Sequence, residues 1–188
     1  MSTLKVDTIL KRTGTGTITL GQSGDTIALG SGASQTGFGG TNTPYFSATR
    51  SSGQTISHNT ATKIQFNNEV VDSNNNYDNS TNYRFTPTTA GKYLINLTTS
   101  VTADANDQYK YAYVYIYKNG SEISSAFSQD NTAYGRTRQL TTHIIADMNG
   151  SSDYIEGYVL INKVSGSGNG KVGGGSTNSV FSGYKLID

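Results

Sequence analysis

From residue 43 onward, apolar and polar residues alternate in segments that are separated by tight-turn residues. Alternation with a period of two predicts β-strands that each bury one face. No segment with helical spacing lies between these strands, so the pattern predicts an all-β sandwich of the jelly-roll type. The ten predicted strands are residues 45–50, 54–57, 62–70, 81–86, 92–102, 109–118, 122–128, 134–148, 153–163 and 177–187.

Turn residues support this division into strands. Asn119-Gly120 and Asn149-Gly150 each stand between two alternating segments, and Asn-Gly is the strongest short signal for a β-hairpin. The glycine-rich segment 166–175 resembles a phosphate-binding loop only superficially. Ser165 stands where that motif needs its first glycine, and Val172 replaces its metal-binding Ser or Thr. The segment is therefore predicted to be a flexible hairpin loop.

The first forty residues follow a different pattern, with a spacing of nine residues between Thr-Ile pairs. A strand this short cannot bury its apolar side chains alone, whereas three parallel copies around an axis would bury them on one another. We therefore predict a trimeric β-repeat stalk and neck over residues 1–42 and a head over residues 43–188. A flexible Gly/Thr/Ser linker is the alternative for the first segment. The predicted stalk contacts are Ile9, Ile18, Leu20, Ile27 and Leu29.

The composition narrows the functional classes. Charged residues make up 14% of the 188 residues and the formal net charge is +1, which gives no electrostatic basis for binding nucleic acid. No segment has the length of a transmembrane helix, and the N-terminus lacks the apolar run of a signal peptide. We therefore expect synthesis in the cytoplasm and no membrane insertion. The absence of cysteine excludes disulfides, thiolate metal sites and cysteine nucleophiles.

The sequence contains no recognisable catalytic constellation. His58 and His143 are the only histidines, and no nucleophile motif accompanies them. Asp104 and Asp107 lie in one predicted loop that could hold a calcium ion, although solvated loop carboxylates are the simpler interpretation. We predict no enzymatic activity, no cofactor and no metal. A polysaccharide hydrolase is an alternative for which no acid/base pair is visible.

Five tyrosines occupy alternate positions in the predicted strand 109–118, so they share one of its faces. An outward aromatic face needs an explanation, because outward strand positions are usually polar. It packs against neighbouring strands or a second subunit, or it forms an aromatic platform for a glycan or another protein. The predicted interface or binding face contains Tyr109, Tyr111, Tyr113, Tyr115 and Tyr117, with Arg136 and Arg138 as candidate cation–π partners.

Several motifs occur in a fixed order in the head. They are Tyr83-x-Phe85-Thr86-Pro87-x-x-x-Gly91-x-Tyr93, Val114-x-Ile116-x-Lys118-Asn119-Gly120 and Phe181-Ser182-Gly183-Tyr184-x-Leu186. In this order the chain from about Tyr45 onward resembles the C1q-like globular domain, part of the wider TNF-like jelly-roll group. The residues that carry this signature, and that the resemblance places in the head core, are Phe46, Phe66, Phe85, Gly91, Tyr93, Val114, Ile116, Phe181, Gly183 and Leu186.

The resemblance implies a homotrimer that recognises ligands through exposed loops or through grooves between subunits. The topology of the family would place the tyrosine strand on the sheet that faces away from the trimer axis. A collagen-like stalk is absent, and the nine-residue repeat stands in its place.

The N-terminal segment, with its Leu-Lys-Val-Asp-Thr-Ile opening and Thr/Gly repeats, is similar to the starts of small marine-phage structural proteins. We therefore expect a bacteriophage fibre protein that is exposed on the surface of the virion. Its N-terminus would bind other virion proteins, and its head would bind a polysaccharide of the host surface. A capsid or tail decoration protein without a role in host recognition is the alternative.

Overall fold

The computed structural model describes residues 9, 16–33, 42–104, 108–131, 135–164, 169–175 and 177–187. The chain divides into two units, residues 1–39 and 40–188. Strands form only in the second unit, the head, as far as the described residues go. No helix with the length and apolar character needed to cross a membrane is found in that part of the chain.

The described part of the head contains thirteen strands. The fold class predicted from the alternating pattern is therefore confirmed, although the number of strands differs from ten. The strands are β1 (Tyr45–Thr49), β2 (Gln54–Ser57), β3 (Thr62–Lys63), β4 (Asn68–Asp72), β5 (Tyr77–Asp78), β6 (Arg84–Phe85), β7 (Gly91–Ala103), β8 (Tyr109–Lys118), β9 (Ser121–Gln129), β10 (Thr137–Met148), β11 (Ile155–Lys163), β12 (Asn169–Val172) and β13 (Ser179–Lys185).

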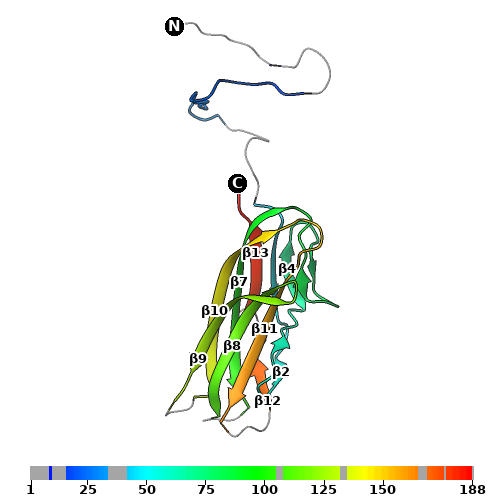
Figure 1. Cartoon of the computed structure of the whole chain (residues 1–188), viewed down its shortest axis with the longest axis vertical. Coiled ribbons are helices and arrows are strands. Elements are labelled where there is room, and N and C mark those ends of the chain that lie inside the picture. Colours follow the sequence, from blue (N-terminus) through cyan, green and yellow to red (C-terminus); the bar gives the residue numbers. More distant parts are fainter. Residues whose placement is uncertain are drawn as a thin grey trace. The chain divides into compact units, whose positions relative to one another are not determined.

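The strands form two antiparallel sheets that face each other (Figure 1). The seven-stranded sheet has the order β2-β12-β7-β13-β1-β4, and β10 also pairs with β7. The six-stranded sheet has the order β5-β6-β11-β8-β9, and β3 also pairs with β11. Pairing between strands that are distant in sequence, such as β1 with β13, is typical of a jelly roll.

The core contains a cluster of aromatic rings, which we call the core aromatic cluster. The Phe46 ring lies 4.3 Å from Phe85 and 5.0 Å from both Tyr77 and Phe181, measured between centroids. These side chains are buried together with most of the predicted signature residues, whereas Leu186 is only half-buried beyond the end of β13. The cluster consists of Phe46, Phe66, Tyr77, Phe85, Tyr93 and Phe181.

The strand predicted over 62–70 is interrupted in its interior, and the strand predicted over 81–86 forms only at residues 84–85. Side chains satisfy the backbone there in place of a neighbouring strand: Gln54 accepts from the N–H of Gln65 (2.9 Å), and the Arg50 guanidinium donates to the carbonyl of Gln65. In the second segment, the Asp78 carboxylate accepts backbone N–H groups from residues 80–82. These hydrogen bonds hold residues 79–82 in a turn.

The glycine-rich segment contains a strand that the sequence pattern did not predict. β12 pairs with β2 and with β7, so residues 169–172 are not the predicted flexible loop. Gly170 faces the core, where a Cβ atom would lie 2.4 Å from Cγ2 of Ile161. Because its inward position has no side chain, the alternating pattern is hidden in the sequence. Residues 165–168 lie outside the described residues.

The strands predicted for the second and third N-terminal repeats are absent from residues 16–33 of the single chain, where residues 23–24 and 31–32 form turns. The N–H of Asp25 donates to the carbonyl of Gln22, and the N–H of Ala33 donates to that of Gly30. A strand needs a hydrogen-bonding partner, and no other described segment of the single chain pairs with these residues. The five predicted stalk contacts, Ile9, Ile18, Leu20, Ile27 and Leu29, are all exposed.

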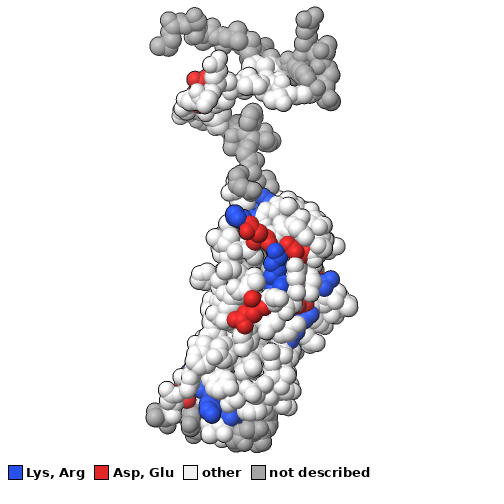
Figure 2. Space-filling model, viewed as in Figure 1, with Lys and Arg blue, Asp and Glu red and all other residues white. Residues whose placement is uncertain are grey.

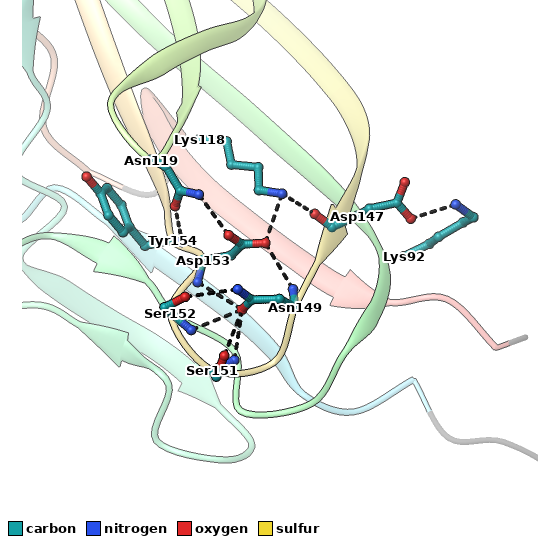
Figure 3. A network of polar contacts seen from close by, with 9 residues as sticks. All are labelled: Lys92, Lys118, Asn119, Asp147, Asn149, Ser151, Ser152, Asp153 and Tyr154. Atoms are coloured by element: carbon teal, nitrogen blue, oxygen red, sulfur yellow. Dashed lines mark hydrogen bonds and ion pairs between the residues drawn. The ribbon is translucent and has the colours of Figure 1, made fainter.

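Two Asn-Gly turns are joined at one end of the head (Figure 3). Asn119 and Gly120 have φ angles of 52° and 80°, as a two-residue hairpin turn requires. Asn119 Nδ2 donates to Asp153 Oδ1 (2.7 Å), and the Lys118 ammonium lies 2.9 Å from Asp153 Oδ2. The hydrogen bond from Asn119, and after it the contact with Lys118, hold the pKa of Asp153 below its usual value. The network fixes the β8–β9 hairpin to the β10–β11 loop.

Candidate functional site

The tyrosine strand β8 directs alternate side chains to the two faces of the six-stranded sheet. Ala112, Val114 and Ile116 are fully buried in the core. The tyrosines between and beside them are half-buried on the outward face, as the alternation predicted. The outward face thus holds Tyr111, Tyr113, Tyr115 and Tyr117.

The prediction is wrong for Tyr109. Its side chain is fully buried, and its hydroxyl donates to the carbonyl of Ser128 (3.1 Å). The register between β8 and β11 shifts between Asn162 and Lys163, which leaves Lys110 as an extra residue in β8. Such a bulge reverses the alternation of side chains, so Tyr109 points into the sandwich.

The outward tyrosines form a continuous row of ring contacts, which we call the tyrosine ladder. Tyr113 and Tyr115 are nearly parallel, with 5.5 Å between centroids. The Tyr117 ring stacks on Tyr158 of β11 at 4.4 Å, and Phe127 of β9 lies 4.5 Å from Tyr113. The ladder therefore crosses three strands and consists of Tyr111, Tyr113, Tyr115, Tyr117, Phe127 and Tyr158.

Sequence reasoning missed two members of the ladder. Phe127 lies opposite Tyr113 in the β8–β9 register, and Tyr158 lies opposite Tyr115 in the β8–β11 register. Phe127 is 49% exposed. The only sequence signal was the position of each residue in an alternating strand, and the pairing of strands was needed to bring them together.

Polar side chains flank the ladder at both ends. At one end the Tyr111 hydroxyl donates to Asn59 Oδ1 (3.2 Å), and Asn162 Nδ2 donates to the same oxygen (3.1 Å). At the other end the Lys63 ammonium lies 5.9 Å above the Tyr158 ring. It also forms an ion pair with Glu156. Hydrogen-bonding groups therefore lie at both ends of the aromatic surface.

Burial changes the acidity of two ladder tyrosines. Desolvation raises the pKa of Tyr115 to about 12, and the charge of Glu122 and the neighbouring tyrosines adds to this shift. Desolvation, followed by the charge of Glu156, also raises the pKa of Tyr158. These hydroxyls therefore stay protonated at neutral pH and can both donate and accept hydrogen bonds.

The two predicted cation–π partners are not in the ladder. The Arg138 guanidinium lies 5.4 Å above the ring of buried Tyr109 and forms an ion pair with Asp130. Arg136 precedes β10, and its carbonyl accepts the N–H of Ala103 at the end of β7. The predicted cation–π contact is thus confirmed for Arg138, but with the inward Tyr109 and not with a ring of the ladder.

A broad area of the visible face of the head is uncharged (Figure 2). Lysine, arginine and acidic side chains gather toward one end of that face, and others lie near the opposite end, with neutral surface between. A neutral surface of this kind suits a neutral or weakly charged ligand better than a polyion.

The outward face of the seven-stranded sheet carries an exposed apolar row across four strands. Ile145 of β10 lies opposite Leu94 of β7, which lies opposite Tyr184 of β13, and Tyr184 lies opposite Tyr45 of β1. Ile145 is 56% exposed, and both tyrosines are exposed. We call these four residues the apolar row.

No group of three or more potential metal ligands gathers in the described residues. The Asp104 carboxylate forms an ion pair with the buried Lys163 ammonium, and Asp107 lies outside the described residues. His58 Nδ1 accepts the N–H of Lys163 (3.2 Å), whereas His143 lies in β10 opposite Asn96. The two histidines therefore lie in different environments, His58 after the end of β2 and His143 within β10.

Comparisons with known proteins agree with this fold. A model of the C1q domain family matches residues 45–186. The crystal structure of murine APRIL at pH 5.0 gives a TM-score of 0.57 at 8% identity and covers 76% of this chain and 98% of that one. Eiger TNF from S. frugiperda gives 0.53 at 9% identity, with 77% and 92% covered.

The globular domain of the zebrafish complement 1qA protein gives a TM-score of 0.49 at 15% identity, and 76% of this chain and 97% of that one are covered. No curated protein matches the chain. At these identities the APRIL and Eiger structures show a shared fold and nothing about ligands.

Proposed function

We propose that this chain, which belongs to the C1q domain family as its signature motifs indicated, is a trimeric bacteriophage appendage that binds a host polysaccharide. C1q/TNF-like domains are generally binding or structural modules without enzymatic activity, and they often form trimers. The observation that carries the proposal is the tyrosine ladder, an aromatic surface bounded by hydrogen-bonding side chains.

The chemistry of the ladder suits a saccharide. A sugar ring presents C–H groups on its faces and hydroxyls on its edge, and tyrosine offers an apolar ring together with a hydroxyl. Tyr111 and Tyr117 are six residues apart in an extended strand, which corresponds to about 20 Å. That length accommodates several consecutive sugars of a chain. Asn59 and Asn162 at one end supply amide groups that can orient the ligand.

The apolar row supports assembly through the seven-stranded sheet. Exposed Ile145, Tyr45 and Tyr184 would lose solvent contact if subunits packed on this face. The neighbouring row runs through His143, Asn96 and Ser182, so it is polar and includes one imidazole. Packing there would leave the tyrosine ladder free on the opposite sheet.

Three heads on one stalk would bind a repeating polysaccharide multivalently. Weak individual contacts are then sufficient, because the second and third heads bind at a high effective concentration. The N-terminal repeats supply the stalk in this proposal. Their isoleucines and leucines, which are exposed in the single chain, would pack on one another around the axis.

Binding is tested with the intact chain and surface polysaccharide purified from candidate host cells, by biolayer interferometry. We expect Tyr113→Ala combined with Tyr115→Ala to weaken binding at least about tenfold, because two adjacent rings of the ladder are lost. Val70→Ala, at a residue that is 60% exposed on β4, is the matched control and should bind as the wild type does. Equal binding by the ladder variant and the control would remove the ladder from the proposal.

Assembly is tested by light scattering after size exclusion. Three chains of 20.0 kDa give about 60 kDa. Ile145→Asp should lower the mass, whereas Phe127→Asp, at a comparably exposed apolar residue on the other sheet, should not. A wild-type mass near that of one chain would overturn the fibre proposal.

The virion role is tested by deleting residues 1–40. We expect the shortened chain to be missing from purified particles while its head retains the β-sheet circular dichroism of the full chain. Particles that lack the protein should then adsorb poorly to host cells. Normal adsorption of particles that have lost physical stability would instead identify a decoration protein. The ladder would then be the surface through which this chain contacts another virion protein.

A further inference from the structure

The tyrosine strand has a glutamate beside it on each neighbouring strand of the six-stranded sheet. In the strand register, Tyr117 of β8 lies opposite Glu156 of β11 on one side and opposite Glu122 of β9 on the other. Residues that lie directly opposite each other in antiparallel strands share one face, with Cβ atoms about 5 Å apart. Both carboxylates therefore lie on the outward face, at the Tyr117 end of the ladder.

On the β11 side, the chain itself supplies a cation to this arrangement. The Lys63 ammonium forms an ion pair with Glu156 and lies 5.9 Å above the Tyr158 ring. Tyr158 is the next outward residue of β11 after Glu156, and its ring stacks on Tyr117. A carboxylate and an aromatic ring thus hold one ammonium together, the carboxylate by its charge and the ring by its electron-rich face.

On the β9 side, the carboxylate has no such cation. Glu122 is exposed and forms no ion pair with a lysine, arginine or histidine of the described residues. The Lys118 ammonium, in the same hairpin, instead lies 2.9 Å from Asp153 Oδ2 and donates to the carbonyl of Asp147 (2.6 Å). About 10 Å separates the backbones of β9 and β11, and the Lys63 ammonium is bound on the β11 side.

The charge of Glu122 reaches the ladder. Desolvation is the main cause of the raised pKa of Tyr115, and the charge of Glu122 is the next cause, so the carboxylate is close to this phenol. The residue of β9 opposite Tyr115 is Ser125, whose small side chain leaves room beside the half-buried Tyr115 and Tyr117. An exposed, uncompensated carboxylate therefore lies next to two accessible aromatic rings.

We propose that Glu122, Tyr115 and Tyr117 bind the protonated amino group of a hexosamine, so that the ladder selects polysaccharides with free amino groups. The β9 side repeats the combination of carboxylate and ring that holds the Lys63 ammonium on the β11 side. A primary ammonium has three N–H donors for the carboxylate, whereas an acetamide or a hydroxyl at the same position of the sugar carries no charge to attract.

This inference rests on the proposed function, because the other sugars of the chain would lie along the ladder. The single uncompensated carboxylate suits a weakly charged chain, in agreement with the largely uncharged face of the head (Figure 2). A quaternary ammonium has no N–H to donate and is typically enclosed by several rings. The rings here lie on one sheet beside a hydrogen-bond acceptor, which favours the primary amine.

The test compares three β-1,4-linked tetrasaccharides that differ at carbon 2 of each sugar: tetraglucosamine, its fully N-acetylated form and cellotetraose. Binding to the full chain is measured by isothermal titration calorimetry in mildly acidic buffer, where the free amines are protonated. We expect tetraglucosamine to bind about tenfold more tightly than the other two. Because the preference is electrostatic and lies at an exposed site, it should shrink as the salt concentration rises.

Glu122→Gln keeps the size of the side chain and removes its charge. This variant should bind tetraglucosamine about tenfold more weakly and the two uncharged tetrasaccharides as the wild type does. Glu69→Gln, at an exposed glutamate of β4 in the other sheet, makes the same change in net charge and is the matched control. It should keep the full preference for tetraglucosamine.

The inference is overturned if tetraglucosamine does not bind, if Glu122→Gln keeps the preference, or if Glu69→Gln loses it equally. Competition by choline as strong as that by glucosamine would overturn the assignment to a primary amine. Equal binding of the three tetrasaccharides, lost when Tyr113 and Tyr115 are replaced by alanine, would reject this inference and leave the proposed function intact. A preference that depends on Glu122, in a chain that binds no host polysaccharide, would reject the proposed function alone.

Discussion

The head contains two aromatic clusters with similar ring spacing and very different exposure to solvent. In the core aromatic cluster the shortest centroid distance is 4.3 Å, between Phe46 and Phe85, and both rings are buried. In the tyrosine ladder the shortest distance is 4.4 Å, between Tyr117 and Tyr158, and both rings are half-buried. Ring contacts alone therefore do not separate a structural cluster from a candidate binding surface.

The two clusters differ in what fills the space when a ring is removed by mutation. A core ring contacts side chains from both sheets, so its removal leaves a cavity. A ladder ring contacts its neighbours on one sheet only, so water can fill the space that its removal leaves. The core cluster should therefore dominate the free energy of unfolding, and the ladder should dominate ligand binding.

Phe46→Ala should produce the largest loss of stability. Phe46 contacts Tyr77, Phe85 and Phe181, and its replacement leaves a cavity between the sheets. We expect the free energy of unfolding to fall by about 3–5 kcal/mol, measured by urea denaturation at a fixed protein concentration. A loss below about 1 kcal/mol would show that the core cluster and the ladder do not differ as proposed.

Gly183→Ala should have the next largest effect, because it overfills the same cluster. A Cβ atom there would lie 2.6 Å from Ile95 Cδ1 and 3.0 Å from both the Leu94 carbonyl oxygen and Phe46 Cε1. We expect a loss of about 1–3 kcal/mol. Phe46→Leu in the same chain should recover part of this loss by making room. Strictly additive losses in the double variant would contradict a clash with Phe46.

The alternating pattern predicted most of the sandwich because one face of each long strand is buried. β8 and β7 follow the pattern closely, with Val114, Ile116 and Ile95 inward. β12 was missed because its inward residue is Gly170, which leaves no apolar signal. The sequence pattern also did not reveal the segments in which a side chain, and not a neighbouring strand, pairs with the backbone, as Gln54 does with Gln65.

The candidate site was predictable only in part, because strand pairing decides it. Four tyrosines of the ladder follow from alternation within β8. The inward turn of Tyr109 depends on an irregularity in the pairing of β8 with β11, which no pattern within one strand reveals. Arg136 was expected beside the tyrosines and instead lines a cavity with Lys171, whose strand was not predicted at all.

Tyr113→Ala should change stability little while it weakens binding. The ring contacts Tyr111, Tyr115 and Phe127 on one side of a sheet, so we expect a loss of about 1 kcal/mol in the free energy of unfolding. Urea denaturation and polysaccharide binding are measured on the same preparation. A loss as large as that of Phe46→Ala would assign the ladder to the core instead of to a binding surface.

The smallest predicted effect concerns alkaline pH and separates a core tyrosine from a ladder tyrosine. Burial raises the pKa of both Tyr93 and Tyr115 to about 12, and Glu122 contributes only to Tyr115. The folded chain keeps these protons where the unfolded chain, with tyrosine pKa values of about 10, releases them. Stability is therefore fully present below about pH 10 and falls as the pH rises toward about 12.

Tyr115→Phe removes one of these titrating groups, so the variant should lose less stability than the wild type between about pH 9 and pH 11.5. Glu122→Gln should reduce the loss by a smaller amount, because it lowers the pKa of Tyr115 and leaves Tyr93 unchanged. Urea midpoints at the two pH values measure the effect. If Tyr115→Phe lost as much stability as the wild type, the alkaline sensitivity would belong to the buried tyrosines alone, and the ladder hydroxyls would be as well solvated as those of an unfolded chain.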